Sequence, residues 1–176
     1  GVEAAFDIDL DHHLLQVGAR YHEDEVDRFQ PTENYDQVNG SLVFQSITQP
    51  NASNNRIGEA QANSLGVQDE WAITDKLTST LSLRYEDVDS SEERYGNITR
   101  SVVASSSENT VSEWLPGLSF SYEMTQQWQL VAGIHKGFSP VGSDAAKHID
   151  PETSINWEMG ARFLGNDVLV EAIAFY

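Results

Sequence analysis

The sequence has no cysteine, few basic residues and no long apolar run, and each absence excludes a class of protein. Without cysteine, the chain can form neither a disulfide nor a thiolate metal site. It carries 10 Lys and Arg against 28 Asp and Glu, for a net charge of −18, so it lacks the basic stripe that nucleic acid or anionic lipid requires. No run of about 18 apolar residues is present, which excludes a helical membrane span.

The strongest positive feature is a period of two residues between apolar and polar side chains. In one segment, Leu118, Phe120 and Tyr122 alternate with Ser119 and Ser121. Successive side chains of a strand leave opposite faces, so this segment predicts a strand with one apolar and one polar face. The same alternation recurs in residues 15–21, 77–85, 128–134 and 157–163. Repetition on this scale predicts a sheet.

The spacing of these segments predicts about eight antiparallel strands. We expect them at residues 2–10, 13–23, 58–71, 77–88, 112–124, 128–138, 155–163 and 168–176. The connections between them alternate between tight turns and long polar loops, the loops covering 24–57, 89–111 and 139–154. Short turns at one rim and long loops at the other are typical of an outer-membrane barrel.

The predicted strand length fits a membrane. A strand of about eleven residues, rising about 3.3 Å per residue and tilted by about 40°, spans roughly 27 Å. This is the height of a hydrocarbon core, and aromatic residues near the strand ends, such as Trp71 and Trp128, suit its two interfaces. The expected fold class is therefore all-β, an antiparallel transmembrane β-barrel.

The phase of the strands predicts only part of a barrel. If the short turns face the periplasm, the first strand runs inward from outside and the eighth ends outside. Complete barrels of this kind begin and end inside. We therefore expect residues 1–176 to be a partial β-barrel domain, a slice of about eight strands.

Five short passages carry a resemblance to a known family. They are residues 35–40 (YDQVNG), 60–71 (AQANSLGVQDEW), 81–86 (LSLRYE), 114–118 (WLPGL) with 137–140 (GFSP), and 150–154 (DPETS) with 157–160 (WEMG). In this order and spacing they resemble the TonB-dependent outer-membrane receptors, most of all the ferric-citrate (ferric dicitrate) branch.

The resemblance implies both an architecture and a function. It implies a barrel of 22 strands around an N-terminal plug domain, which is absent from these residues, in the outer membrane of a Gram-negative bacterium. The implied function is TonB-energised uptake of a ferric chelate, either ferric citrate or another siderophore, with ExbB and ExbD as further partners. Outer-membrane lipid would surround the wall.

A pocket for a bulky anion such as ferric citrate needs cations and hydrogen-bond donors at the mouth and in the lumen. The expected ligand-binding residues are Arg20, Arg84, His135, Lys136, Ser139 and Lys147. An alternative role is open for such arginines, because lumen cations also pair with neighbouring carboxylates, as Arg84 could with Glu86.

Other chemistry finds little support in the sequence. No nucleophile motif, phosphate loop or paired-carboxylate motif is present, so we expect no enzyme and no cofactor. Asp87, Asp89, Glu92 and Glu93 have a spacing that calcium could use, but a solvated acidic loop explains them better, and we expect no metal site. Two alternatives remain: a soluble lipocalin-like β-barrel that binds a small ligand, and a passive porin or adhesin barrel.

Overall fold

The structure, a computed structural model, describes residues 1–143 and 149–176. It consists almost entirely of β-strands. In chain order they are β1 (Val2–Leu10), β2 (His13–Phe29), β3 (Thr32–Val38), β4 (Ser41–Thr48), β5 (Asn55–Thr74), β6 (Leu77–Tyr95), β7 (Val103–Glu123), β8 (Trp128–Ser139), β9 (Glu152–Leu164) and β10 (Leu169–Phe175), with a short 3₁₀ helix, η1 (Ala52–Asn54), before β5. In the described part of the chain, no helix is long and apolar enough to cross a membrane.

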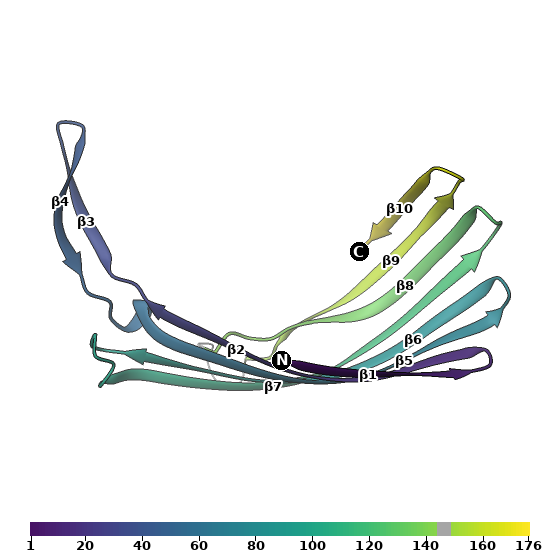
Figure 1. Cartoon of the computed structure of the whole chain (residues 1–176), viewed down its shortest axis with the longest axis horizontal. Coiled ribbons are helices and arrows are strands. Elements are labelled where there is room, and N and C mark those ends of the chain that lie inside the picture. Colours follow the sequence, from purple (N-terminus) through teal and green to yellow (C-terminus); the bar gives the residue numbers. More distant parts are fainter. Residues whose placement is uncertain (144–148) are drawn as a thin grey trace.

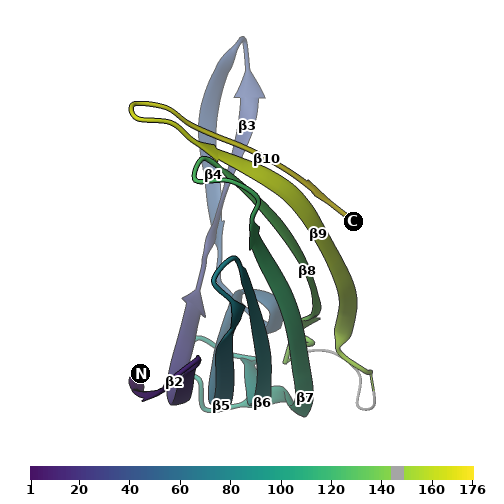
Figure 2. The ribbon, with the colours of Figure 1, turned by 90° about the vertical axis from the view of Figure 1, so that its right-hand side faces the viewer.

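Eight of the strands form one antiparallel sheet in the order β1-β2-β5-β6-β7-β8-β9-β10. Strands that follow one another in this sheet are neighbours, as in an up-and-down barrel wall. Figures 1 and 2 show that the sheet is strongly curved, with β1 and β10 at its two edges. The predicted eight-stranded slice is therefore confirmed in strand number, order and direction.

The register places side chains of one kind on one face. Leu81 pairs with Leu118, Leu118 with Ile134, and Ile134 with Trp157, so these residues form a continuous row across β6 to β9. We call the surface that carries this row the apolar face. The intervening residues form the polar face, where Ser82 pairs with Gly117.

The sheet has almost no buried core of its own. Within the described residues, Tyr95 is the only buried apolar side chain, whereas residues of the apolar face such as Leu81 and Met159 are 60% and 69% exposed. Soluble proteins rarely expose a contiguous apolar surface of this extent. This face therefore requires an apolar environment, as the wall of a membrane barrel does.

Two of the short turns are closed by hydrogen bonds from backbone N–H groups to a threonine hydroxyl within the turn. At the β5–β6 turn, the hydroxyl of Thr74 accepts from the backbone N–H groups of Lys76 and Leu77, at 3.2 and 3.0 Å. At the β7–β8 turn, the hydroxyl of Thr125 accepts from Gln127 and Trp128, at 3.1 and 3.0 Å. Such threonine turns reverse the chain in few residues and hold the strands in register.

The predicted long loops contain more strand than expected. β2, β5, β6 and β7 run well past the apolar rows, into residues 24–29, 55–57, 89–95 and 103–111. The prediction of a loop over 24–57 was also wrong in a second respect, because it contains the two-stranded hairpin β3–β4. Figure 1 shows this hairpin standing apart from the main sheet.

Candidate functional site

A hollow of about 480 Å³ lies on the polar face where small residues meet across the strands. Gly18 of β2 pairs with Gly66 of β5, and Ala5 of β1 pairs with Gly18. A methyl group added at Gly66 would meet no heavy atom within 4 Å. The absent side chains thus leave space over the middle of the sheet, and longer polar side chains surround it.

Four of the six predicted ligand-binding residues line this hollow, namely Arg20, Arg84, His135 and Lys136. Ser139 ends β8 on the same face as His135, four residues further toward the long-loop rim. Lys147 lies outside the described residues. The structure therefore brings the first four together, and their contact with a ligand stays a prediction.

Carboxylates neutralise part of the positive charge around the hollow. Arg84 forms an ion pair with Glu86 on the same strand, as the sequence suggested, and Glu86 also accepts a bond from Ser64 Oγ at 2.6 Å. Glu86 is only 7% exposed, and the partners offset much of the cost of burying its charge. Arg84 consequently contributes less charge to the hollow than its position suggests.

Lys136 contacts the polar face although strand alternation places it on the other side. It follows His135 of the polar face in β8, so its side chain is expected on the apolar face. Its ammonium nevertheless lies 2.7 Å from a carboxylate oxygen of Glu113, a polar-face residue of β7. The β7–β8 ladder ends at Gly117 and His135, although both strands continue. Pro116, the next residue of β7, has no N–H with which to extend the ladder. The strands part there, and Lys136 crosses the gap.

Two arginines of the polar face contact no carboxylate within the residues that the structure describes. They are Arg20, beside the hollow, and Arg28, whose guanidinium donates to the side-chain oxygen of Gln30 at 2.8 Å. Glu3 is the register partner of Arg20 and borders the same hollow, but no ion pair joins these two described residues, so the guanidinium keeps its donors open to an anion. Arg20 is therefore the best placed of the predicted residues to hold a negatively charged group.

Sequence reasoning missed a second group of cations near the long-loop rim. Arg28 pairs in register with Arg56, and Arg56 with Arg94, so three arginines lie side by side on β2, β5 and β6. The buried carboxylate of Glu92 accepts from Arg56 at 3.0 Å and from Arg94 at 2.5 Å. The three arginines are neighbours because β2, β5 and β6 extend beyond the apolar rows, into residues that the sequence predicted as loops.

The segment after β8 lies against this part of the polar face. Residues 140–143 line a hollow of about 380 Å³ together with Val26, Val88 and Arg56. The side-chain amide of Asn109 donates to the carbonyl of Gly142 at 3.1 Å. The beginning of the predicted 139–154 loop therefore crosses the sheet near the arginines.

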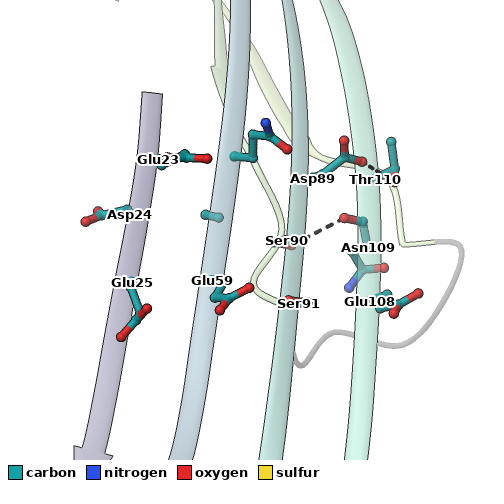
Figure 3. Close-up of a pocket in the computed structure, with 12 residues that line it drawn as sticks. Glu23, Asp24, Glu25, Glu59, Asp89, Ser90, Ser91, Glu108, Asn109 and Thr110 are labelled. Carbon is teal, nitrogen blue, oxygen red and sulfur yellow. Dashed lines mark hydrogen bonds between the residues drawn. The ribbon is translucent and has the colours of Figure 1, made fainter. Parts of the chain in front are cut away.

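A third hollow, of about 630 Å³, is strongly acidic (Figure 3). Glu23, Glu25, Glu59 and Glu108 contribute carboxylates from β2, β5 and β7. By register they lie on the side of the sheet that carries the apolar face, beyond its last aromatic row. Within the described residues, no three His, Asp or Glu side chains are grouped closely enough to hold a metal ion.

The predicted calcium-spaced residues do not share a face. They lie on β6 rather than in a loop, and strand alternation separates Glu92 from the other three. Glu92 is occupied by Arg56 and Arg94 on the polar face, whereas Asp89 accepts a bond from Thr110 Oγ1 at 2.6 Å on the other (Figure 3).

The β6–β7 connection is fastened to the neighbouring strands by Arg100. Its guanidinium donates to both carboxylate oxygens of Asp27 and, from Nε, to the side-chain oxygen of Asn55 at 2.8 Å. The same group lies over the rings of Phe29 and Tyr95, 5.8 and 5.4 Å from their centroids. The hydrogen bonds that Arg100 donates to Asp27 hold the pKa of that carboxyl below its usual range. Arg100 thus links the β6–β7 connection to β2 and β5 at the long-loop rim.

Comparisons with known proteins agree with this architecture. A family model described as "TonB dependent receptor-like, beta-barrel" matches residues 1–176. Among curated proteins, the pesticin receptor of Yersinia enterocolitica is 27% identical over 113 residues, which are 60% of this chain and 17% of that protein.

Solved structures show the same fold. The unliganded ferric citrate transporter FecA superposes with a TM-score of 0.72 at 20% identity, covering 98% of this chain and 26% of that one. The ferric yersiniabactin uptake receptor FyuA from Yersinia pestis superposes with a TM-score of 0.67 at 18% identity, covering 98% and 27%. The chain thus spans about a quarter of these solved chains.

Proposed function

The chain belongs to the TonB-dependent receptors, as a stretch of their outer-membrane β-barrel, and we propose that the whole receptor takes up a ferric chelate across the outer membrane of a Gram-negative bacterium. Members of this family are transporters rather than enzymes. Membership also decides against the soluble lipocalin-like barrel and the passive porin or adhesin. In this setting the apolar face contacts lipid and the polar face lines the lumen.

The polar hollow beside Arg20 is the observation that carries the proposed ligand class. Small residues at Gly18 and Gly66 leave room there, and Arg20 offers donors that no carboxylate occupies within the described residues. A ferric chelate with carboxylate or phenolate oxygens suits such a site, because a guanidinium binds oxyanions in a bidentate manner. His135 and Lys136 on the opposite side of the hollow would complete the contact.

Ferric citrate and other ferric siderophores both fit this chemistry. Two relatives in fold are named for ferric citrate and for ferric yersiniabactin, which supports a ferric chelate in general. The net charge of −18 on these 176 residues opposes the long-range attraction of a strongly anionic complex, so the local arginines must supply the binding. Ferric citrate and another siderophore with carboxylate or phenolate oxygens are both candidates.

We expect TonB, working with ExbB and ExbD, to energise transport through the plug domain that receptors of this family carry. The residues described here would contribute the wall, part of the mouth and part of the binding surface.

Uptake by living cells tests the proposal. A strain that lacks the receptor gene is complemented with the whole receptor, and uptake of radiolabelled iron is measured with ferric citrate and with a neutral hydroxamate chelate. Arg20→Gln should raise the half-saturating concentration about ten-fold, the usual effect of losing one charged hydrogen bond. Arg162→Gln is the matched control, because Arg162 is bonded to Glu171 near the short-turn rim.

The two parts of the proposal fail differently. Unchanged uptake in the Arg20→Gln strain, at equal surface expression, would reject the hollow as the binding site and leave transport intact. Absence of receptor-dependent uptake for every ferric chelate supplied would reject the proposed function itself.

A further inference from the structure

An ionisable pair interrupts the apolar face close to the short-turn rim. Nδ1 of His13 lies 3.1 and 2.9 Å from the two carboxylate oxygens of Asp69. Asp69 occupies a row in which its register partners are Leu15 on β2 and Leu81 on β6. A carboxylate among aliphatic neighbours on a lipid-facing surface is costly unless polar partners surround it.

An aromatic ring fixes the imidazole at this position. His13 pairs in register with Trp71, and the two rings stack with centroids 5.5 Å apart and planes 12° from parallel. His13 is the first residue of β2 after a two-residue turn, so this row marks the end of the apolar face at the short-turn rim. Tryptophan at such a boundary lies at headgroup depth.

The pair satisfies only part of its own hydrogen-bonding capacity. Protonated His13 has a second N–H, on Nε2, on the other side of the ring from Asp69. Asp69 can accept further bonds, and no other donor to its carboxylate is present in the described residues. The side chains are 41% and 31% exposed, on the face that contacts lipid. At headgroup depth, a lipid headgroup or water can supply the missing partners.

We propose that His13, Asp69 and Trp71 form a binding site for a phospholipid headgroup that carries both a phosphate and a primary ammonium, as phosphatidylethanolamine does. The short-turn rim of such barrels faces the periplasm, and the adjacent leaflet consists of phospholipid. When His13 is protonated, the lipid phosphate accepts from its Nε2–H, and the lipid ammonium donates to Asp69. Trp71 holds the imidazole plane and packs against the glycerol region.

Native mass spectrometry of the whole receptor tests this site directly. The purified receptor is mixed with equal amounts of phosphatidylethanolamine, phosphatidylcholine and phosphatidylglycerol. The wild type should retain phosphatidylethanolamine about ten-fold more than phosphatidylcholine, whose quaternary ammonium has no N–H to donate. Asp69→Asn should bring the first lipid down to the level of the second, and His13→Gln should lower retention of phosphatidylethanolamine and phosphatidylglycerol.

Asp87→Asn is the matched control, because Asp87 of β6 lies on the same side of the sheet as Asp69 but in the row of Tyr21, toward the other rim. It should leave the lipid preference unchanged. Equal retention of phosphatidylethanolamine and phosphatidylcholine by the wild type, or an unchanged preference in Asp69→Asn, overturns the proposal.

A measurement with the pair intact covers the case in which the variants fold poorly. Phosphatidylethanolamine and phosphatidylcholine with identical brominated chains are compared as quenchers of tryptophan fluorescence in the whole receptor. The wild type should be quenched more by the ethanolamine lipid, and Trp71→Phe should lose that difference. Quenching that is independent of the headgroup contradicts the site.

Discussion

Arg100 and Asp27 lie 73 residues apart in the sequence and form a two-pronged ion pair at the long-loop rim. Arg100 adopts a left-handed backbone conformation, with φ at 54°, and this turns its side chain back over the ends of β2 and β5. The pair therefore joins the connection after β6 to a strand that was completed much earlier in the chain.

Replacing this arginine should loosen the rim without unfolding the wall. Arg100→Lys keeps the charge but loses the fork that spans both oxygens of Asp27 and the bond to Asn55. We expect faster hydrogen exchange in residues 96–102 and little change in the strands at the short-turn rim. Ile98→Ala, which shortens an exposed side chain of the same connection, is the control. Unaltered exchange in Arg100→Lys would show that the fork contributes nothing to the order of the rim.

The same pair predicts a dependence on acidity. The folded state lowers the pKa of Asp27, so the stabilisation is fully present above the ordinary aspartate value of about 3.9 and is lost as the pH falls through the lowered value. Exchange in residues 96–102, corrected for intrinsic rates, should therefore accelerate only below about pH 4. Asp27→Asn should abolish this transition. A transition near neutral pH would point to another group.

The two faces of β6 should respond differently to a charge. Leu83→Arg places a cation on the lipid-contacting face, with Val67 as its register partner, and should destabilise the receptor in a bilayer by about 2–4 kcal/mol. Thr80→Arg faces the lumen, where its register partner is Glu70, and should cost much less. Reversible unfolding in lipid vesicles measures both. Thr80 suits this comparison better than Ser82, which borders the hollow with Arg20 and Arg84, or Gln129, which already accepts a bond from Arg162. Equal costs would contradict the assignment of the faces.

Two glycines should differ sharply in their tolerance of alanine. A methyl group at Gly160 would clash with the carbonyl oxygen of Ala172, so Gly160→Ala must push β9 and β10 apart. We expect a loss of about 1–3 kcal/mol, the range of overpacking. Gly66→Ala fills empty space and should be close to neutral. Unfolding midpoints of the two variants give the comparison, and a neutral Gly160→Ala would show that the β9–β10 pair is easily displaced.

The periodic part of the fold was predictable because lipid imposes the period. Where one face contacts hydrocarbon, as along Leu77 to Tyr85, apolar and polar residues must alternate, and both the strands and their register can be read. Beyond Tyr85 and Tyr21, toward the long-loop rim, neither face of the sheet contacts lipid, so apolar and polar residues need not alternate. The strands continue there, but the sequence predicted loops. For the same reason, the row formed by Arg28, Arg56 and Arg94 could not be predicted.

Other features escaped prediction for individual reasons. The turn of the β3–β4 hairpin has the Asn39-Gly40 pair that favours a two-residue turn, with φ at 50° and 84°, but its strands lack an apolar face that would have drawn attention to it. The gathering of Arg20, Arg84 and His135 follows from register between strands distant in sequence. The crossing of Lys136 to Glu113 depends on where the β7–β8 ladder stops, which no local pattern in the sequence reveals.

The β3–β4 hairpin is a surface element whose sequence can change without disturbing the barrel wall. It has its own ladder and its own aromatic pair, Tyr35 against Phe44, and it stands clear of the sheet (Figure 1). Leu42, beside the turn, is 72% exposed, and neither strand of the hairpin borders the hollow next to Arg20. Substitutions in the hairpin would therefore alter the outer surface of the receptor without altering that hollow.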